Sequence, residues 1–373
     1  MNILLINPSQ DRVYGKKMMP AYPALGLVYV GTVLKKEGHN VRLLDVDTED
    51  IKEAEYRDIF KSFNPDAVGI TSVTPTFKNA VKWGTLSKKI KNIPVVLGGI
   101  HATIAPEEVI KEGPIDIIVI GEGELTVVEL FNCLSQGSAG LEAIKGIWFK
   151  RGNKIVSNER RPMIEDLDSL PFPDRTLLKK PYKFIPPDAT KLPIASIITS
   201  RGCPGSCTFC CTKHIFSKRF RARSAHNISL EVKALVAEGI KEIHISDDTF
   251  TLVKPRVLDF VQAMKKEKFN VDFRFMNGLR ADFVDKDILR ACKEIGVKTV
   301  GYGVESGNKN VLKNIKKNIS LDVTRNAFKI SKELGFETWA FLIFGLPGDT
   351  KETIKETIRF VKELDPDSAN KIL

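Results

Sequence analysis

The sequence predicts an α/β protein in two parts: a doubly wound parallel sheet, then a partial (β/α)6 barrel that is cut short near its sixth strand. Three observations support this prediction. The chain has 373 residues, more than a single core usually serves. Short apolar runs alternate with helical periods in both parts, as in parallel sheets whose strands are joined by helices. A Pro-rich stretch separates the parts, so we expect domains at 1–135 and 193–373 and a linker at 136–192.

The composition is that of a globular chain. Hydrophobic residues make up 43% and charged residues 28%, and no apolar run approaches the length of a membrane span. The start, MNILLINPS, lacks a basic leader and looks like a first strand, so we expect a cytoplasmic protein. In that reducing compartment, clustered cysteines serve more often as metal ligands or redox thiols than as disulfides. The net charge of +11 permits nucleic-acid or acidic partners without establishing one.

The first part carries the pattern of a doubly wound sheet. Strands are predicted at 2–9, 42–47, 66–73, 94–103 and 116–124, and an amphipathic helix ends at Gly38. Ligands of such sheets lie beyond the carboxyl ends of the strands. The candidate binding residues at those ends are Ser9, Thr71, Ser72, Gly98, Gly99, His101, Gly121 and Glu122.

The middle stretch changes in character. Residues 145–175 predict a small hairpin and then an extended segment. The prolines that argue against helices here are Pro171, Pro173, Pro181, Pro186, Pro187 and Pro193. We therefore place the domain boundary in this stretch.

The second part returns to strand-helix alternation with longer units. Strands are predicted at 195–203, 242–250, 272–280, 299–307 and 338–348. Sites in parallel barrels lie on the loops after the strands. The residues that fall there are the cysteines of RGCPGSCTFCC, Asp247, Asp248, Thr249, Arg280, Glu305, Ser306 and Gly345.

A sixth strand of this barrel barely begins, near 367–373. We therefore expect an open barrel edge, unless another chain covers it.

Three cysteines of the motif have ligand spacing: Cys203-x3-Cys207-x2-Cys210. Three thiolates this close suit an iron–sulfur cluster or zinc. Zinc would need a fourth ligand, and His214 is available. Cys133 and Cys292 are single and distant. Cys211 would change the spacing if it replaced Cys210, so we interpret it as a loop thiol.

This spacing, with Phe209 before the third cysteine and a strand before the loop, resembles the radical S-adenosylmethionine enzymes over about 193–373. ISDDTF, GVESG and FGLPGDT stand where that family contacts S-adenosylmethionine. The resemblance implies a 4Fe-4S cluster on Cys203, Cys207 and Cys210 and reductive cleavage of S-adenosylmethionine to a 5′-deoxyadenosyl radical. It assigns Asp247, Asp248 and Thr249 to the amino group, Arg280, Glu305 and Ser306 to carboxylate and ribose, and Gly345 to adenine.

The stretch from Arg201 to Leu230 carries six basic residues and no acidic one. It could support an anionic cluster, carboxylate or substrate, or it could be a solvated basic turn. Aromatic residues are too sparsely interleaved for a nucleic-acid groove, so we do not expect nucleic acid as a partner.

The first part resembles the Rossmann-like cobalamin-binding domain of a subgroup of this family, through INPS, PALGLVYVGTVLKKEGHNVRLLD, LGGIHAT and GEGE over 1–135. Its glycines could let backbone approach the corrin, or could merely turn the chain. The chain contains no Asp-x-His sequence. We therefore expect base-off cobalamin with no protein histidine on cobalt, and His101 either hydrogen-bonds the cofactor or only packs.

Together these features predict a cobalamin-dependent enzyme that methylates an unactivated carbon or phosphorus centre. The alternatives are a non-methylating relative, such as an oxidative cyclase or a C–C bond-forming enzyme, and a cobalamin- or metal-binding module without turnover. The expected partners are a small-molecule or peptide substrate and an external electron donor of the flavodoxin or ferredoxin type. A methylthiotransferase fits poorly, because only Cys133 lies in the first part.

Overall fold

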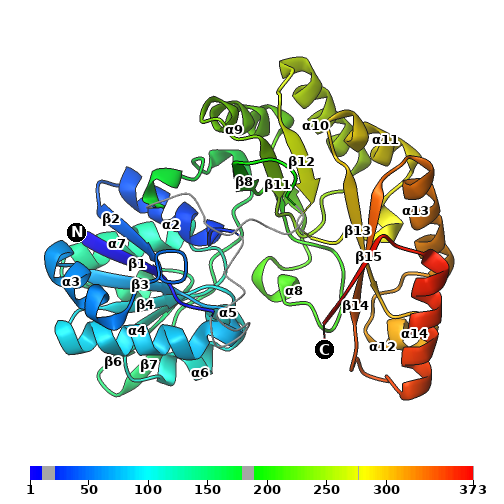
Figure 1. The fold of residues 1–373 in the computed structure, drawn as a ribbon. Helices are drawn as coiled ribbons and strands as arrows, with labels where there is room; N and C mark the ends of the chain where they lie inside the picture. The colour runs from blue at the N-terminus through cyan, green and yellow to red at the C-terminus, as the bar shows by residue number, and fades with distance from the viewer. Residues whose placement is uncertain (11–21, 179–188, 276, 373) are drawn as a thin grey trace. The chain divides into compact units, whose positions relative to one another are not determined.

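A computed structural model describes residues 1–10, 22–178, 189–275 and 277–372 (Figure 1). The chain forms two compact units. The first unit contains Met1–Glu165, and the second contains Asp188–Lys213 and Ser217–Leu373, while short pieces near the linker are divided between them. Each unit is described below by itself.

The first unit is built on a seven-stranded sheet of order β2-β1-β3-β4-β5-β6-β7. Its first five strands pair in parallel. They are β1 (Asn2–Asn7), β2 (Asn40–Asp45), β3 (Ala67–Thr71), β4 (Val95–Gly98) and β5 (Ile117–Val119). The order 2-1-3-4-5 reverses direction between β1 and β3, and ligands of doubly wound sheets bind outside the carboxyl ends of the strands at such a point.

Helices cover both faces of this sheet (Figure 1). On one face α2 (Leu25–Lys36) and α7 (Glu124–Ser135) pack with Ile3 and Leu5 of β1. On the other face α3 (Glu53–Phe63) and α4 (Phe77–Ile90) pack with Leu4 and Ile6. Alternate residues of β1 are thus buried in two different cores, as a strand with both faces covered requires. Two short helices, α5 (Ile100–Ile104) and α6 (Pro106–Lys111), follow β4.

The predicted hairpin is present and belongs to the first sheet. β6 (Ile147–Arg151) and β7 (Lys154–Ser157) pair antiparallel, and β6 also pairs antiparallel with β5. The hairpin therefore covers the edge of β5, which would otherwise expose unpaired backbone groups. Between the hairpin and β8 (Ile194–Ile197), the described residues form only the 3₁₀ turns Leu167–Ser169 and Arg175–Leu177. Pro181, Pro186 and Pro187 lie outside the described residues.

The second unit contains six parallel strands in two three-stranded sheets, β12-β11-β8 and β13-β14-β15. The strands are β8 (Ile194–Ile197), β11 (Glu242–Ile245), β12 (Asp272–Phe275), β13 (Thr299–Glu305), β14 (Glu337–Ile343) and β15 (Ser368–Ile372). A parallel bridge between Leu279 and Tyr302 links the two sheets. In the described part of the chain β8 and β15 are not paired with each other, so the barrel is open.

The sixth strand is better formed than the sequence predicts. β15 pairs with β14 over five residue pairs, from Trp339↔Ser368 to Ile343↔Ile372. Its sequence, SANKI, shows no apolar alternation, so the pattern gives little sign of a strand. Backbone pairing with β14 is what forms it.

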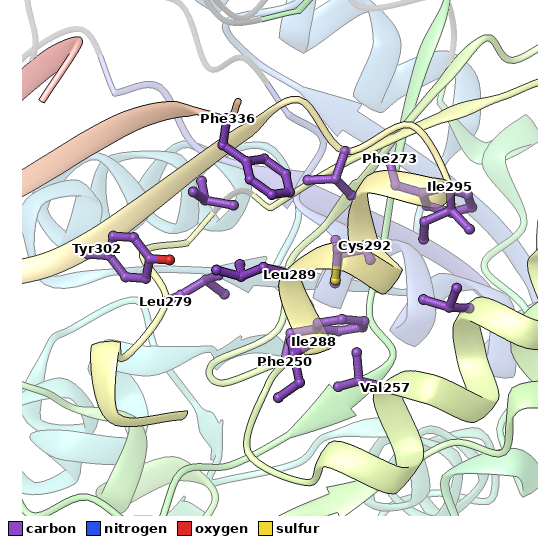
Figure 2. Close-up of a cluster of buried hydrophobic side chains, with 14 of the residues drawn as sticks. Phe250, Val257, Phe273, Leu279, Ile288, Leu289, Cys292, Ile295, Tyr302 and Phe336 are labelled. Atoms are coloured by element: carbon purple, nitrogen blue, oxygen red, sulfur yellow. The ribbon is translucent and has the colours of Figure 1, made fainter. Parts of the chain in front are cut away.

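Helices join the second unit's strands: α9 (Ala225–Ala237), α10 (Lys254–Glu267), α11 (Lys286–Glu294), α12 (Lys309–Asn314), α13 (Leu321–Glu333) and α14 (Lys351–Leu364). Ser224, Asp285, Asn308, Ser320 and Thr350 cap α9, α11, α12, α13 and α14, each accepting from backbone N–H groups. The core between helices and strands includes Phe250, Phe273, Leu289, Cys292 and Tyr302 (Figure 2).

A two-stranded antiparallel ribbon follows β8 in the chain. β9 (Ser200–Arg201) pairs with β10 (Arg221–Ala222), and Arg223 N donates to Thr199 O at 3.0 Å. The segment between them includes the cysteine motif and α8 (Thr212–Ile215). The ribbon therefore holds together the two ends of the segment 202–220. The sequence pattern did not predict this feature.

Candidate functional site

The three spaced cysteines are half-buried free thiols on the loop after β9. Gly205 shows how closely their side chains approach. A Cβ atom at Gly205 would lie 3.3 Å from Sγ of Cys203, 3.9 Å from Sγ of Cys207 and 3.5 Å from Nη1 of Arg280. Two sulfur atoms and a guanidinium group therefore lie close around Gly205, and a side chain at this position would crowd the Cys203 sulfur.

Arg280 supplies positive charge beside the sulfur atoms. Its Nη1 is 4.0 Å from Sγ of Cys207, and its Nη2 is 2.8 Å from Oδ2 of Asp282. The guanidinium carbon lies 4.9 Å from the ring centre of Phe283. Burial lowers the pKa of Arg280, but Asp282 and the nearby cysteines outweigh burial and raise this pKa. The group is therefore a fixed cation in the cysteine loop's surroundings.

The surroundings of Cys203 favour its thiol over its thiolate. Burial raises its pKa, against the lowering effects of the Gly205 N–H and of Arg280. The Gly205 N–H points at Sγ of Cys203, with 3.4 Å between N and S. Because metal binding needs the thiolate, the loop would release protons when a metal binds.

The other cysteines have different surroundings. Burial raises the pKa of Cys211, and it raises that of Cys292 to about 12 in the core of the second unit. Cys133 donates to Ala139 O at 3.3 Å. No three His, Cys, Asp or Glu side chains of the described residues converge as one metal ion requires.

Asp247, after β11, has its carboxylate fully engaged with the chain. Oδ1 accepts from Thr199 N at 2.6 Å, and Oδ2 accepts from Ser200 Oγ at 2.6 Å and from Thr199 Oγ1. Nη2 of Arg256 lies 3.6 Å from Oδ2, and the Asp247 side chain is 0% exposed. Asp247 thus ties the segment after β11 to the segment after β8.

Asp248 contacts the cysteine loop. Its Oδ2 accepts from Gly202 N at 2.9 Å, and its Oδ1 accepts from Thr212 Oγ1 at 3.0 Å. Burial raises the pKa of Asp248, against the lowering effect of these hydrogen bonds. The next residue, Thr249, has a buried Oγ1 without a hydrogen-bond partner among the described residues.

Glu305, at the end of β13, has an unusual backbone. Its φ is +59°, a left-handed value that costs energy for a residue other than glycine. Its Oε1 accepts from Nζ of Lys317 at 2.6 Å, and both side chains are at most 10% exposed. Ser306 Oγ lies 3.2 Å from Oγ1 of Thr357. The end of β13 is therefore held by a buried ion pair and a hydroxyl pair.

Gly345, after β14, is exposed and has φ +81°. Its N–H donates to Oδ2 of Asp349 at 3.0 Å. A Cβ atom here would meet nothing within 4 Å, so the conformation and not crowding accounts for glycine.

The basic stretch divides into two classes. Arg201, Arg221 and Arg223 are buried, whereas Lys218 and Arg219 are exposed. Arg223 forms a buried ion pair with Glu231. Part of this charge is therefore structural and part is solvated.

The first unit's strand ends contain two buried polar atoms without hydrogen-bond partners among the described residues, Ser72 Oγ and His101 Nε2. Nδ1 of His101 lies 3.1 Å from Oγ1 of Thr74, and the imidazole ring lies 4.3 Å from that of Phe77. Burial lowers the pKa of His101. Both orphaned atoms could hydrogen-bond a ligand that reaches this edge.

The glycines of this edge have separate causes. Gly99 has φ +96°, and a Cβ there would lie 2.8 Å from Ser72 O and 2.8 Å from Oγ1 of Thr71. The chain itself therefore requires this glycine. At Gly98 the nearest atoms would be at ordinary contact, from 3.8 Å. Gly121 has φ +78°, and its N–H donates to Oγ1 of Thr103 at 3.0 Å.

Two further candidates contact other parts of the first unit. Ser9 O accepts from Nδ2 of Asn79 at 2.7 Å. Oε2 of Glu122 accepts from Ile164 N at 2.9 Å, so this side chain holds the segment after the hairpin.

Sequence reasoning missed several residues of these networks. They are Thr74, Thr199, Ser200, Thr212, Arg256 and Lys317. Lys317 follows Lys313 and Lys316 in the sequence, where the pattern of lysines suggests a solvated surface. Only its burial distinguishes it from them.

Over the described residues, no helix has the length and apolar content to cross a membrane.

Two family models match the chain. Residues 197–361 match the Radical SAM superfamily, and residues 12–131 match the B12 binding domain. These segments contain the cysteine motif and the strand ends of the first unit, except Ser9.

Three curated relatives align with nearly the whole chain. An uncharacterized methyltransferase of Pyrococcus horikoshii is 36% identical, over 99% of this chain and 79% of that protein. The anaerobic magnesium-protoporphyrin IX monomethyl ester cyclase of Rubrivivax gelatinosus is 29% identical, over 99% and 67%. The cytidylyl-2-hydroxyethylphosphonate methyltransferase of Streptomyces wedmorensis is 29% identical, over 95% and 75%.

A solved structure shares the fold. It is that of the radical S-adenosylmethionine methyltransferase TsrM from Kitasatospora setae, with cobalamin and a 4Fe-4S cluster bound. The TM-score is 0.81 at 20% identity, over 99% of this chain and 71% of that one. The two family models and the 36% identical relative together show that this chain belongs to the cobalamin-binding radical S-adenosylmethionine enzymes, a family of methyltransferases and cyclases.

Proposed function

We propose that this enzyme is a cobalamin-dependent methyltransferase that acts on an unactivated carbon or phosphorus centre. The observation that carries the proposal is the grouping of two cysteine sulfurs and Arg280 around Gly205, at the strand ends of the second unit. Residues 1–135 would bind cobalamin, residues 136–192 would connect the domains, and residues 193–373 would bind the cluster and S-adenosylmethionine. When bound, these cofactors supply one-electron chemistry and a methyl carrier.

Cys203, Cys207 and Cys210 would each bind one iron of a 4Fe-4S cluster and leave the fourth iron for S-adenosylmethionine. Each sulfur would bind a different iron, so the three need not converge on one point. Arg280 would offset the negative charge of the three thiolates.

The S-adenosylmethionine contacts follow the strand ends. The amino group would lie at Asp247, Asp248 and Thr249, the carboxylate and ribose at Arg280, Glu305 and Ser306, and the adenine at the backbone of Gly345. Chain donors hold both carboxylates in place, and Thr249 Oγ1 has no partner among the described residues, so Thr249 Oγ1 and backbone carbonyls would be further acceptors for the amino group.

Cobalamin would bind base-off at the first unit's strand ends, with no protein histidine on cobalt. The contact residues would be Ser9, Thr71, Ser72, Gly98, Gly99, His101, Gly121 and Glu122. Corrin side chains carry many amides, which suit the orphaned atoms of Ser72 and His101. His101 would hydrogen-bond the cofactor through Nε2, since Nδ1 already faces Thr74.

An external donor of the flavodoxin or ferredoxin type would supply the electron. Lys309 and Lys313 of α12 are exposed, as is Lys316 after this helix, and the adjacent Ile315 O accepts from Thr208 N of the cysteine loop at 3.0 Å. An acidic donor protein fits such a surface. The substrate would be a small molecule or a peptide, and the enzyme would work in the reducing cytoplasm.

The test uses S-adenosylmethionine with a labelled methyl group, the reconstituted enzyme, cobalamin and a reductant. Label on cobalamin with S-adenosylhomocysteine, together with 5′-deoxyadenosine, is the expected result. Cyclisation, the reaction of the named Rubrivivax gelatinosus relative, is the second candidate. Formation of 5′-deoxyadenosine without methyl transfer would favour it, and absence of both products would favour a binding module.

A further inference from the structure

We infer that Asp248 is a positioning residue that holds the cysteine loop ready for its cluster, and that its carboxylate does not contact S-adenosylmethionine directly. The inference rests on the proposed function, in which Cys203, Cys207 and Cys210 bind that cluster. It assigns Asp248 a different partner from the one that the family resemblance suggests.

The two hydrogen bonds of Asp248 reach the two ends of the cysteine loop. Gly202 immediately precedes Cys203, and Thr212 immediately follows Cys211. The two oxygens of Asp248 accept from Gly202 N at 2.9 Å and from Thr212 Oγ1 at 3.0 Å. One carboxylate thus closes both ends of the segment that carries all three ligands.

Both ends of the cysteine loop have a local feature that the Asp248 hydrogen bonds hold in place. Gly202 has φ +92°, so the chain makes a left-handed turn there and then enters the loop. At the other end Oγ1 of Thr212 also lies 3.3 Å from Sγ of Cys210. Asp248 therefore acts on the last ligand through a single hydroxyl group.

The neighbouring carboxylates of Asp247 and Asp248 bind different segments of the chain. Asp247 binds Thr199 and Ser200, which belong to the segment after β8. Asp248 accepts hydrogen bonds from groups at the two ends of the cysteine loop. Asp247 therefore holds the segment after β8, and Asp248 holds the cysteine loop that follows this segment.

The residue chemistry gives a graded set of variants. Asp248→Asn can keep both hydrogen bonds, because the amide oxygen accepts from Gly202 N and the NH₂ group donates to the Thr212 hydroxyl. Asp248→Ala removes both, and Thr212→Val removes one with little change of shape. Asp285→Ala is the control, because Asp285 also accepts hydrogen bonds in this unit, but from Asp287 N and Ile288 N at the start of α11 and from Nζ of Lys254.

The measurements are iron and sulfide content after anaerobic reconstitution, and the rate of iron loss to a chelator. Hydrogen exchange of the amides from 202 to 212 in the metal-free protein reports the loop without any activity. Asp248→Ala should raise the iron-loss rate and loop exchange about tenfold or more, since hydrogen bonds to charged groups are worth about that factor or more. Thr212→Val should show a smaller rise in the same direction. Asp248→Asn and Asp285→Ala should stay near wild type.

The inference is overturned if Asp248→Ala and Thr212→Val lose iron at the wild-type rate. It is equally overturned if Asp248→Asn keeps its cluster but binds S-adenosylmethionine more than tenfold more weakly, because the carboxylate would then serve the amino group. If Asp248→Ala does not fold, Thr212→Val and Asp248→Asn decide the matter. Wild-type protein that takes up no cluster would instead refute the proposed function.

Discussion

At the strand ends of the first unit, Ser72 Oγ and His101 Nε2 are buried without hydrogen-bond partners among the described residues. At the strand ends of the second unit, both oxygens of Asp247 and of Asp248 accept hydrogen bonds from the chain. Thr249 Oγ1 and Arg256 Nε, close to these carboxylates, are also buried without a partner among the described residues. The carboxylates of the second edge are thus held by the chain, whereas the first edge leaves the polar atoms of Ser72 and His101 for a ligand.

The difference has a physical meaning. A buried polar group without a partner costs about 1–3 kcal/mol, so it suits a place where a ligand supplies the missing partner. A loop that must bring three thiolates together carries like charges, and it needs anchors and a cation such as Arg280 before the cluster binds. The first edge would therefore bind its ligand through polar atoms that have no partner in the chain. The second edge would bind its cluster through a loop that the chain already holds in place.

The largest effect is expected at the cysteines themselves. Cys203→Ala, Cys207→Ala and Cys210→Ala should each lose the 4Fe-4S cluster and 5′-deoxyadenosine formation to background, because each removes one of three ligands. Cys211→Ala should retain both. Iron analysis and product chromatography measure these outcomes, and a Cys211 variant as inactive as the other three would contradict the ligand assignment.

Acid should weaken the second unit through Glu242, whose pKa is lowered to about 2. Burial raises this pKa, but hydrogen bonds from His244 and Thr190 outweigh it. Because the pKa is depressed on folding, the stabilisation is present above the model-compound value of 4.5 and is lost as the pH falls towards 2. It amounts to at most about 3 kcal/mol.

Thermal unfolding of wild type and Glu242→Gln at several pH values checks this expectation. The stability difference between the two proteins should shrink from neutral pH towards about pH 3. A constant difference over this range would show that the Glu242 charge does not anchor the unit.

Removal of the cation beside the sulfurs should have an intermediate effect. Arg280→Met should make the cluster harder to reduce, lowering its midpoint potential by about 60 mV, which corresponds to tenfold in a one-electron equilibrium. Spectroelectrochemical titration measures the shift. Lys218→Met, an exposed residue of the basic stretch, is the control. An unchanged potential in Arg280→Met would show that the second edge does not depend on this charge.

The smallest effect is expected at the first edge. Ser72→Ala and His101→Ala should each weaken cobalamin binding by about tenfold or less, the worth of one hydrogen bond. Titration of each apoprotein with hydroxocobalamin measures the affinity. The electron paramagnetic resonance spectrum of the reduced cobalamin should stay the same in His101→Ala, and a loss of nitrogen splitting would instead identify His101 as a cobalt ligand. Wild-type affinity in both variants would remove the contrast between the two edges.

Much of the fold could be predicted from the chain's own pattern. The apolar runs at 2–9, 66–73 and 242–250 contain β1, β3 and β11, and the helix that ends before Gly38 is α2. Such elements depend on local periodicity and on turn residues. The β9–β10 ribbon was not predicted and β15 was predicted only as a beginning strand, because these strands are short, lack apolar alternation and form by pairing with strands distant in sequence.

The sequence by itself determined the cysteine spacing, the two-part order of strands and helices, and the strand ends where candidate residues gather. Only the tertiary structure decided that Asp248 binds Gly202 and Thr212, that Lys317 pairs with Glu305, and that Gly99 is required by Ser72. Asp248 and Gly202 are 46 residues apart. Local pattern records burial and backbone conformation, whereas a hydrogen-bond partner depends on which strand ends the fold brings together.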